Sequence, residues 1–216
     1  MGREIELKLT IGRADIDRLI HHSFISRYLE SPVTRKRLIN HYFDTPDQML
    51  RKHHMALRVR WNGEVYVQTL KQKGESRNGL TNRGEWEWPL ESPGLDATLV
   101  PMDLWPAVVR SQLDTLVPLF ETNFERTLWL LGIPSGSLSK NRIPARVEMA
   151  LDQGRIRVAD GHFSPEDEIL EVELELLEGD PDILHSVWEQ LANDIRLTPS
   201  DLSKAERGYR LIGGSA

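Results

Sequence analysis

Six stretches of the sequence alternate charged and apolar residues, and their charged side chains could bind both phosphate and metal. The first is EIELK, in which Glu4, Glu6 and Lys8 fall on one face of a β-strand and Ile5 and Leu7 on the other. The later stretches with the same arrangement are HMALRVRW, VQTLKQK, RGEWEWPL, ARVEMALD and LEVELEL. Each of them predicts a strand with one charged face and one largely apolar face.

The charged faces carry both signs. Their cations are Lys8, Arg58, Arg60, Lys71, Lys73, Arg83 and Arg146. Their acids are Glu4, Glu6, Glu85, Glu87, Glu148, Asp152, Glu171, Glu173 and Glu175. Guanidinium groups match the oxygens of a phosphate, and carboxylates can hold Mg²⁺ or Mn²⁺ that bridges to it. The combination favours a metal-assisted polyphosphate site.

The repetition of this pattern also indicates how the strands are arranged. A sandwich would place the charged faces in water, but six such strands favour a closed barrel with a charged interior and helices over its apolar outside. Removing charges from water costs several kcal/mol per ion unless they are paired or bound. A charged interior is therefore expected to be a hydrated cavity for a highly charged ligand.

The predicted fold is α+β, mainly antiparallel β, because period-two runs alternate with turn signals. Strands are expected near 3–10, 36–44, 55–62, 64–73, 83–90, 122–132, 143–152 and 168–177, with short extended pieces near 26–30 and 155–159. Helices are expected near 13–23, 103–113 and 181–196.

Composition narrows the possible functions. The 216 residues suit one domain, 1–216, and the formal net charge of −6 disfavours nucleic acid as a partner. Cysteine is absent, which excludes disulfides, thiolate metal sites and Cys nucleophiles and is typical of a reducing compartment, so we expect a cytoplasmic protein. No apolar run approaches the roughly 18 residues of a membrane helix, and no signal peptide or Gly-rich P-loop is found.

The ordered series of motifs resembles the CYTH superfamily, also called triphosphate tunnel metalloenzymes. EIELK is similar to its ExExK signature, and the similarity continues through HYFDTP, LRVR, TLK, RGEWE, FERTLW, VEMALDQG, EVELELLEGD and LSKAERGY. ExExK alone is weak, whereas the series covers nearly the whole chain. The later motifs look most like the CYTH domain of bacterial inorganic triphosphatases, some of which carry a helical CHAD domain afterwards. We expect no CHAD domain in this chain.

The resemblance implies an eight-stranded antiparallel tunnel that binds a triphosphate with Mg²⁺ or Mn²⁺. It implies metal ligands at Glu4, Glu6, Glu148, Asp152, Glu171 and Glu173. It implies phosphate-binding residues at Lys8, Arg58, Arg60, Lys71, Arg83, Arg126 and Lys204. Of these, Lys8, Glu4 and Glu6 are the expected catalytic residues, although the base that activates water stays open between Lys8 and the glutamates. Lys73 and Arg146 share the predicted inner face with less support from the family pattern.

The expected activity is hydrolysis of inorganic triphosphate to phosphate and pyrophosphate. Class IV adenylyl cyclase and thiamine triphosphatase have the same charge requirements and remain alternatives. A module that binds polyphosphate or a nucleotide without catalysis is a further alternative, but it would have less need for the acids. The sequence leaves the oligomeric state open.

Overall fold

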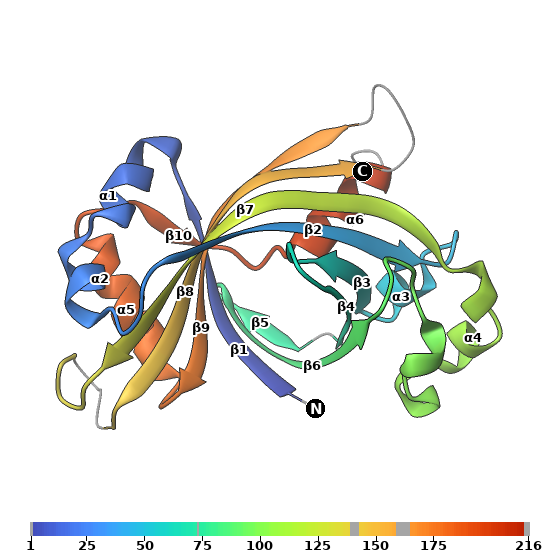
Figure 1. Cartoon of the computed structure of the whole chain (residues 1–216), viewed down its shortest axis with the longest axis horizontal. Helices are drawn as coiled ribbons and strands as arrows, with labels where there is room; N and C mark the ends of the chain where they lie inside the picture. The colour runs from blue at the N-terminus through green and yellow to red at the C-terminus, as the bar shows by residue number, and fades with distance from the viewer. Residues whose placement is uncertain (1, 73, 139–142, 159–164, 214–216) are drawn as a thin grey trace.

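Eight strands form a closed antiparallel barrel in the computed structural model, which describes residues 2–72, 74–138, 143–158 and 165–213 (Figure 1). In their order around the barrel they are β1 (Gly2–Ile11), β9 (Glu166–Glu178), β8 (Ala145–Val158), β7 (Val117–Ile133), β2 (Thr34–Asp44), β3 (Met55–Trp61), β4 (Tyr66–Gln72) and β6 (Leu80–Leu90). The barrel closes because β1 pairs with β9 on one side and with β6 on the other. Two short strands, β5 (Glu75–Arg77) and β10 (Leu197–Pro199), extend β6 and β1.

The alternating sequences fix which side chains face inward. Directly opposed residues of an antiparallel pair lie on the same face of the sheet. Glu4 opposes Arg83 and Lys8 opposes Glu173, whereas Leu7 opposes Leu174 in a fully buried apolar layer. The charged residues therefore line the barrel, and the apolar residues form its outside, as the sequence predicts.

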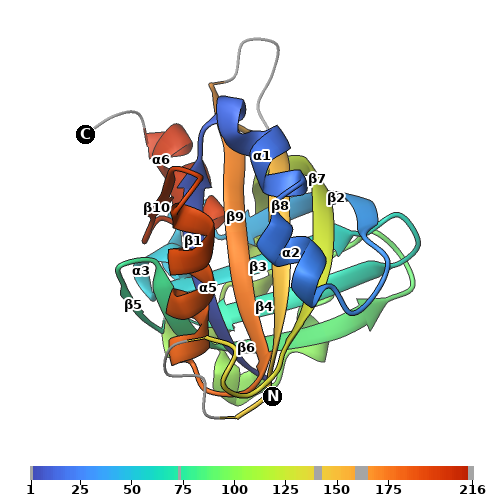
Figure 2. The same ribbon diagram turned by 90° about the vertical axis from the view of Figure 1, so that its left-hand side faces the viewer.

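Helices cover that apolar outside. α1 (Ile16–Ile20), α2 (Ser23–Tyr28) and α5 (Asp182–Ala192) pack on β1, β7, β8 and β9 (Figure 2). The short helices α3 (Met49–Lys52) and α4 (Ala107–Arg110) cover β3 and β4. Single 3-10 turns complete these connections at η1 (Arg13–Asp15), η2 (Ala97–Leu99), η3 (Met102–Leu104) and η4 (Leu113–Thr115).

The last helix, α6 (Lys204–Gly213), packs differently from the others. Its Tyr209 joins an apolar cluster with Phe120, Phe124 and Ile156, which lie on the same faces of β7 and β8 as the charged residues further along those strands. α6 thus fills one end of the barrel interior. A Cβ at Gly208 would lie 2.2 Å from the Phe120 ring, so only glycine lets the helix approach this closely.

Several predicted boundaries were wrong. Residues 26–30 are not an extended piece: α2 runs to Tyr28, because Phe24 and Ile25 bury a helical face, and only Leu29 forms an isolated bridge with Leu131. The predicted helix 13–23 divides into η1, α1 and the start of α2, and 103–113 divides into short turns around α4. The two predicted strands 143–152 and 155–159 are one strand, β8, through its described residues.

Candidate active site

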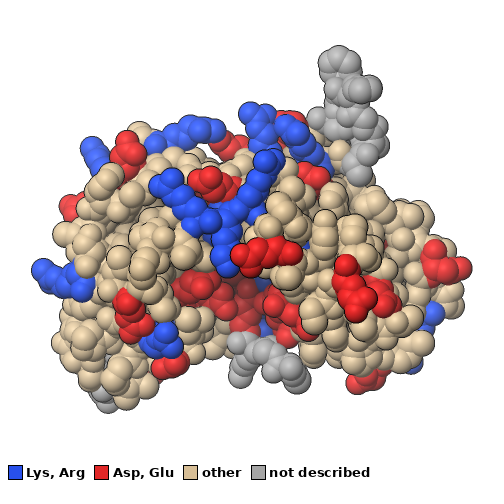
Figure 3. Space-filling view, in the orientation of Figure 1, with Lys and Arg blue, Asp and Glu red and all other residues tan. Residues whose placement is uncertain are grey.

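The charged side chains surround a cavity of about 640 Å³ inside the barrel. Its lining includes Glu4, Glu6, Lys8, Arg58, Arg60, Lys71, Arg83, Arg126, Glu148, Glu173 and Lys204, together with Tyr42, Glu85, Glu87 and Glu175. The carboxylates predicted to bind metal come from β1, β8 and β9, while the cations beyond Lys8 come from β3, β4, β6, β7 and α6. Figure 3 shows Lys and Arg side chains beside a group of Asp and Glu side chains at the centre of one face.

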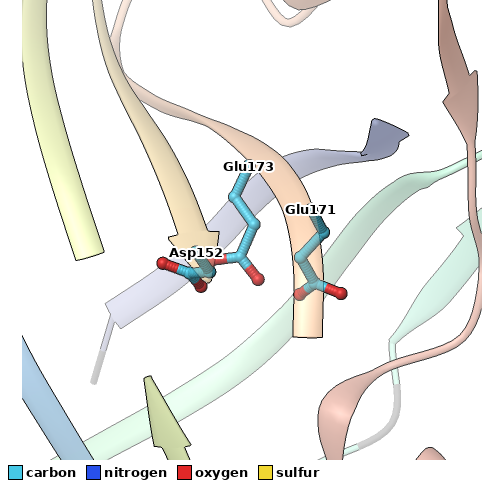
Figure 4. Close-up of side chains that lie close together, drawn as sticks. All are labelled: Asp152, Glu171 and Glu173. Carbon is cyan, nitrogen blue, oxygen red and sulfur yellow. The ribbon is translucent and has the colours of Figure 1, made fainter. Parts of the chain in front are cut away.

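Lys204, the first residue of α6, lies among three carboxylates on β8 and β9. Its Nζ is 2.6 Å from Asp152 Oδ2 and 2.9 Å from Glu173 Oε1, and it also donates to Glu171. The carboxylates of Asp152, Glu171 and Glu173 point toward one another (Figure 4), and one oxygen from each lies within 4.8 Å of the others. This acidic cluster, defined as Asp152, Glu171 and Glu173, is almost removed from solvent.

Burial and pairing change the acidity of these groups. Burial opposes the charge on Lys204, but the three carboxylates outweigh it and raise the pKa of its ammonium. Burial would also raise the pKa of Glu173, yet Lys204, Arg126 and Lys8 hold it well below its usual value. The pKa of Glu171 is raised, because burial and the neighbouring Glu173 exceed the effect of Lys204. Neighbouring cations, and not solvent, therefore compensate the negative charge of the cluster.

Arg126 completes the cationic side of the cluster. Its Nε and Nη2 donate to the two oxygens of Asp152 at 2.7 and 2.6 Å, and Nη2 also donates to Glu173. The sequence pattern alone supports Arg126 weakly, because Leu128 and Leu130 share its face of the strand. The structure places Arg126 in the cavity, where the FERTLW motif predicts it.

Glu4 and Glu6 form a second group of ion pairs on β1. Lys71 Nζ lies 2.9 Å from Glu4 Oε1, Arg83 Nε lies 2.6 Å from Glu4 Oε2, and Arg83 Nη2 lies 3.0 Å from Glu6 Oε1. Burial would raise the pKa of Glu4, but Lys71 and Arg83 overcome it and keep the carboxylate charged. Lys71 also contacts Glu85 at 3.1 Å.

The remaining predicted cations have few partners. Lys8 Nζ donates to the backbone oxygen of Leu202 at 3.3 Å and lies 4.0 Å from Glu6. Arg58 lies 3.6 Å from Glu85, and its buried Nε has no hydrogen-bond partner among the described residues.

Arg60 is the least neutralised of these cations. It donates to Asn40 Oδ1 at 2.7 Å, and no carboxylate of the described residues lies within ion-pair distance of it. Burial and the neighbouring Arg58 and Arg126 lower the pKa of Arg60 to about 10. An anion entering the cavity would relieve this repulsion.

Glu175 and Tyr42 are among the cavity residues to which the sequence analysis gave no role. Glu175 was placed on the charged face of its strand but not among the metal ligands; burial, Glu4 and Glu148 raise its pKa to about 7. Tyr42 lies in the HYFDTP motif, directly opposite Arg58, and is buried at the cavity wall. The period-two alternation of LEVELEL could have identified Glu175, whereas Tyr42 carries no charge signal.

Two other residues, Arg146 and Lys73, were predicted to share the inner face. Arg146 lies at a register shift before Val147, where its half-exposed side chain pairs with Glu30 and Glu178 instead of entering the cavity. Lys73 lies outside the described residues.

The donor set fits a divalent metal ion. Three carboxylates within reach of one another are the hard oxygen ligands that Mg²⁺ and Mn²⁺ prefer. Among the residues the structure describes, the grouping that meets this distance contains Asp152, Glu171 and Glu173; Glu4, Glu6 and Glu148 line the cavity outside it. The geometry thus divides the predicted metal ligands into two sets.

A search of the described helices finds none that is long and apolar enough to cross a membrane.

Comparison with known proteins gives a consistent assignment. The chain is 32% identical to the inorganic triphosphatase of Haemophilus influenzae over 211 residues, which are 98% of this chain and 55% of that protein. The chain thus spans about half the length of this curated relative.

Solved structures share the fold. A protein from Hippeastrum described as an adenylyl cyclase candidate with a dominant triphosphatase activity has a TM-score of 0.60 at 19% identity, over 99% of this chain and 97% of its own. An adenylate cyclase candidate from Vibrio parahaemolyticus has a TM-score of 0.55 at 12% identity, over 99% of this chain and 100% of its own. The CYTH domain model matches residues 2–209, and the chain therefore belongs to the CYTH domain family.

Proposed function

We propose that this chain hydrolyses inorganic triphosphate to phosphate and pyrophosphate with the help of Mg²⁺ or Mn²⁺. The observation that carries the proposal is one cavity inside the barrel that is lined both by cations, on β1, β3, β4, β6, β7 and α6, and by carboxylates, on β1, β6, β8 and β9. The 32% identity to the Haemophilus inorganic triphosphatase supports this substrate.

The cations would bind the substrate. Arg60 has no carboxylate of the described residues within ion-pair distance, and Arg58 and Lys8 each have one, at 3.6 and 4.0 Å, so these three cations are the first partners we assign to the phosphate oxygens. Lys71, Arg83, Arg126 and Lys204 already hold acids at shorter distances and would share their charge between those acids and the substrate. Several fixed positive groups along one chain of phosphates favour an in-line arrangement for phosphoryl transfer.

The acids would hold the metal. Asp152, Glu171 and Glu173 form the set whose distances suit one ion, and Glu4, Glu6 and Glu148, which line the cavity together with Glu173, are further candidate ligands. When bound, the ion would neutralise phosphate charge and lower the pKa of a coordinated water. A non-catalytic phosphate sensor would have less need for these carboxylates, which favours an enzyme.

In the reaction, the oxygen of a water molecule bonds to a terminal phosphorus and the bridging P–O bond breaks. The pyrophosphate leaves with the bonding electron pair, and the proton of the water passes to a basic group of the cavity. Lys8, Glu4 and Glu6 are our candidates for handling this proton and the charge that develops near β1. Arg58, Arg60 and Arg126 would stabilise the negative charge that spreads over the transferred group.

The test is to supply tripolyphosphate, ATP and thiamine triphosphate separately with Mg²⁺ or Mn²⁺ and to identify the products by chromatography. We expect phosphate and pyrophosphate from tripolyphosphate as the fastest reaction. Cyclic AMP from ATP would replace our proposal with a cyclase, and faster release from thiamine triphosphate would change the substrate. Binding of tripolyphosphate without any product would mean that the cavity is a sensor.

A further inference from the structure

Asp44, at the end of β2, is a fully buried carboxylate that joins three parts of the fold. Its Oδ1 accepts hydrogen bonds from the backbone N–H groups of Thr45 and Leu50, both at 2.7 Å. Its Oδ2 accepts from the backbone N–H of Arg51 at 2.9 Å and from the hydroxyl of Tyr209 at 2.7 Å. The first three donors are local to β2 and α3, whereas Tyr209 comes from α6, 165 residues later in the chain.

The ring of Tyr209 is also held in place, by an aromatic side chain and a guanidinium group. It meets Phe120 edge-on with ring centroids 5.2 Å apart, and Phe120 in turn stacks on Tyr42 at 4.6 Å. The guanidinium of Arg51 lies 5.2 Å from the centre of the Tyr209 ring. Burial and Asp44 raise the pKa of Tyr209, so the hydroxyl stays protonated and remains a donor. The contact therefore attaches α6 to β2 through a hydrogen bond and packed rings.

Lys204 is the first residue of α6, the helix that Tyr209 attaches to β2. It precedes Tyr209 by five residues on the same helix, which places their Cα atoms about 7.5 Å apart along the helix axis. A continuous helix transmits the position of one residue to the other with little freedom. A change in the depth at which Tyr209 is held would therefore move the Lys204 ammonium, which lies 2.6 and 2.9 Å from Asp152 and Glu173.

We propose that Asp44 and Tyr209 are positioning residues that seat α6 and thereby hold the Lys204 ammonium in the acidic cluster. Neither residue contributes to the cluster itself. The importance of this seating for the reaction rests on the proposed function, but the seating can be tested without substrate or metal. The pair also gives a physical role to the Asp of HYFDTP and to the final Tyr of LSKAERGY.

The test compares how fast individual lysines react with acetic anhydride, followed by mass spectrometry of the metal-free, substrate-free protein. Tyr209→Phe removes the hydroxyl and keeps the ring. Tyr28→Phe is the matched control, since Tyr28 lies on α2 outside the barrel and packs against Phe24. Lys71, which lies on β4 and pairs with Glu4 and Glu85 instead of the acidic cluster, is the internal reference for general loosening of the fold.

We expect the reaction of Lys204, normalised to that of Lys71, to be about fivefold faster in Tyr209→Phe and unchanged in Tyr28→Phe. Gly208→Ala provides a second displacement of α6 with the hydroxyl intact, because its new Cβ would collide with Phe120. It should also raise the normalised reactivity of Lys204.

Unchanged Lys204 reactivity in both α6 variants would overturn the proposal. A parallel rise of Lys204 and Lys71 would also overturn it, because the hydroxyl would then support the whole fold and not the position of one lysine. Failure of the proposed function would leave these reactivities unaffected, so the two ideas are tested separately.

Discussion

Arg126 and Asp152 lie opposite each other on β7 and β8 and form a two-point ion pair, with Nε–Oδ1 and Nη2–Oδ2 distances of 2.7 and 2.6 Å. Asp152 is fully buried, and Arg126 is nearly so. The pair lies at the boundary between β7, which contributes a cation to the site, and β8, which contributes carboxylates. One guanidinium therefore contacts the acids that would hold a metal and borders the space that would hold phosphate.

This geometry predicts that lysine cannot replace Arg126. Arg126→Lys keeps the charge but loses the planar fork that meets both oxygens of Asp152. We expect kcat/KM for tripolyphosphate to fall by roughly 10- to 100-fold, or about 1.4–2.8 kcal/mol of transition-state stabilisation. Arg155→Lys, on the exposed face of β8, is the control and should have no effect. Wild-type kinetics in Arg126→Lys would show that the fork is not used.

Removing the charge of Arg60 should weaken substrate binding without destabilising the fold. Because it has no ion-pair partner among the described residues and is repelled by Arg58 and Arg126, Arg60→Met should leave the free energy of unfolding unchanged or raise it by about 1 kcal/mol. The KM of the Arg60→Met variant for tripolyphosphate should rise at least about tenfold, since a phosphate-binding cation is lost. Urea unfolding and steady-state kinetics measure the two effects.

Arg35→Met removes the same charge from an exposed position on β2 and should leave KM unchanged. A drop in stability of several kcal/mol in Arg60→Met, without a change in KM, would assign Arg60 to structure instead of substrate binding.

The acidic cluster predicts a selective loss of metal affinity. Asp152→Asn and Glu173→Gln each remove a charged oxygen ligand, so we expect Mn²⁺ binding, measured by calorimetry, to weaken by about tenfold or more. Glu166→Gln serves as the control, because Glu166 pairs with Arg155 and Arg157 away from the cavity. Equal Mn²⁺ affinity in all three variants would place the metal elsewhere, with Glu4 and Glu6 as the next residues to test.

Removal of metal should stop the reaction and leave the fold intact. Lys204 and Arg126 already neutralise much of the acidic cluster, so the barrel does not depend on an ion for its charge balance. We expect EDTA to abolish phosphate release, excess Mg²⁺ or Mn²⁺ to restore it, and the circular dichroism spectrum to stay unchanged. Full activity in EDTA would contradict the metal-dependent proposal.

The barrel could be predicted from the sequence because each charged face alternates with an apolar one over several residues. The pattern failed where backbone contacts decide the structure. Gly154 lies between the predicted strand 143–152 and the predicted extended piece 155–159, but it continues β8, where a Cβ would lie 2.2 Å from the backbone oxygen of Asn123. Close approach of two strands explains this glycine, and the sequence of one strand does not contain that information.

α6 was missed for a related reason. Its buried positions are Lys204, Gly208 and Tyr209, which do not form an apolar stripe. The helix is instead held by a cluster of acids, the Phe120 ring and the carboxylate of Asp44, all supplied by distant segments. The resemblance of LSKAERGY to the family motif thus implied that Lys204 belongs to the site, while the way it reaches the site became visible only in three dimensions.

All predicted site residues except Asp152 and Glu171 line one cavity, and strand alternation determines this direction for those that lie on strands. What the alternation could not provide is the pairing among them: that Glu4 and Glu6 hold Arg83, or that Asp152 joins Glu171 and Glu173. Such pairing depends on the register between strands far apart in the chain. The same limit explains Arg146, whose register shift removes it from the alternation that had placed it inside.

The most direct test of the account measures phosphate released from tripolyphosphate with Mn²⁺ by the wild-type protein and by Glu4→Gln/Glu6→Gln. The Glu64→Gln/Glu121→Gln variant, changed outside the cavity lining, is the matched control. We predict rapid release by the wild type and the control, and a loss of at least about 100-fold in the Glu4→Gln/Glu6→Gln variant, with its fold retained by circular dichroism. Equal phosphate release by all three proteins would show that the charged interior of the barrel is not the site of the reaction.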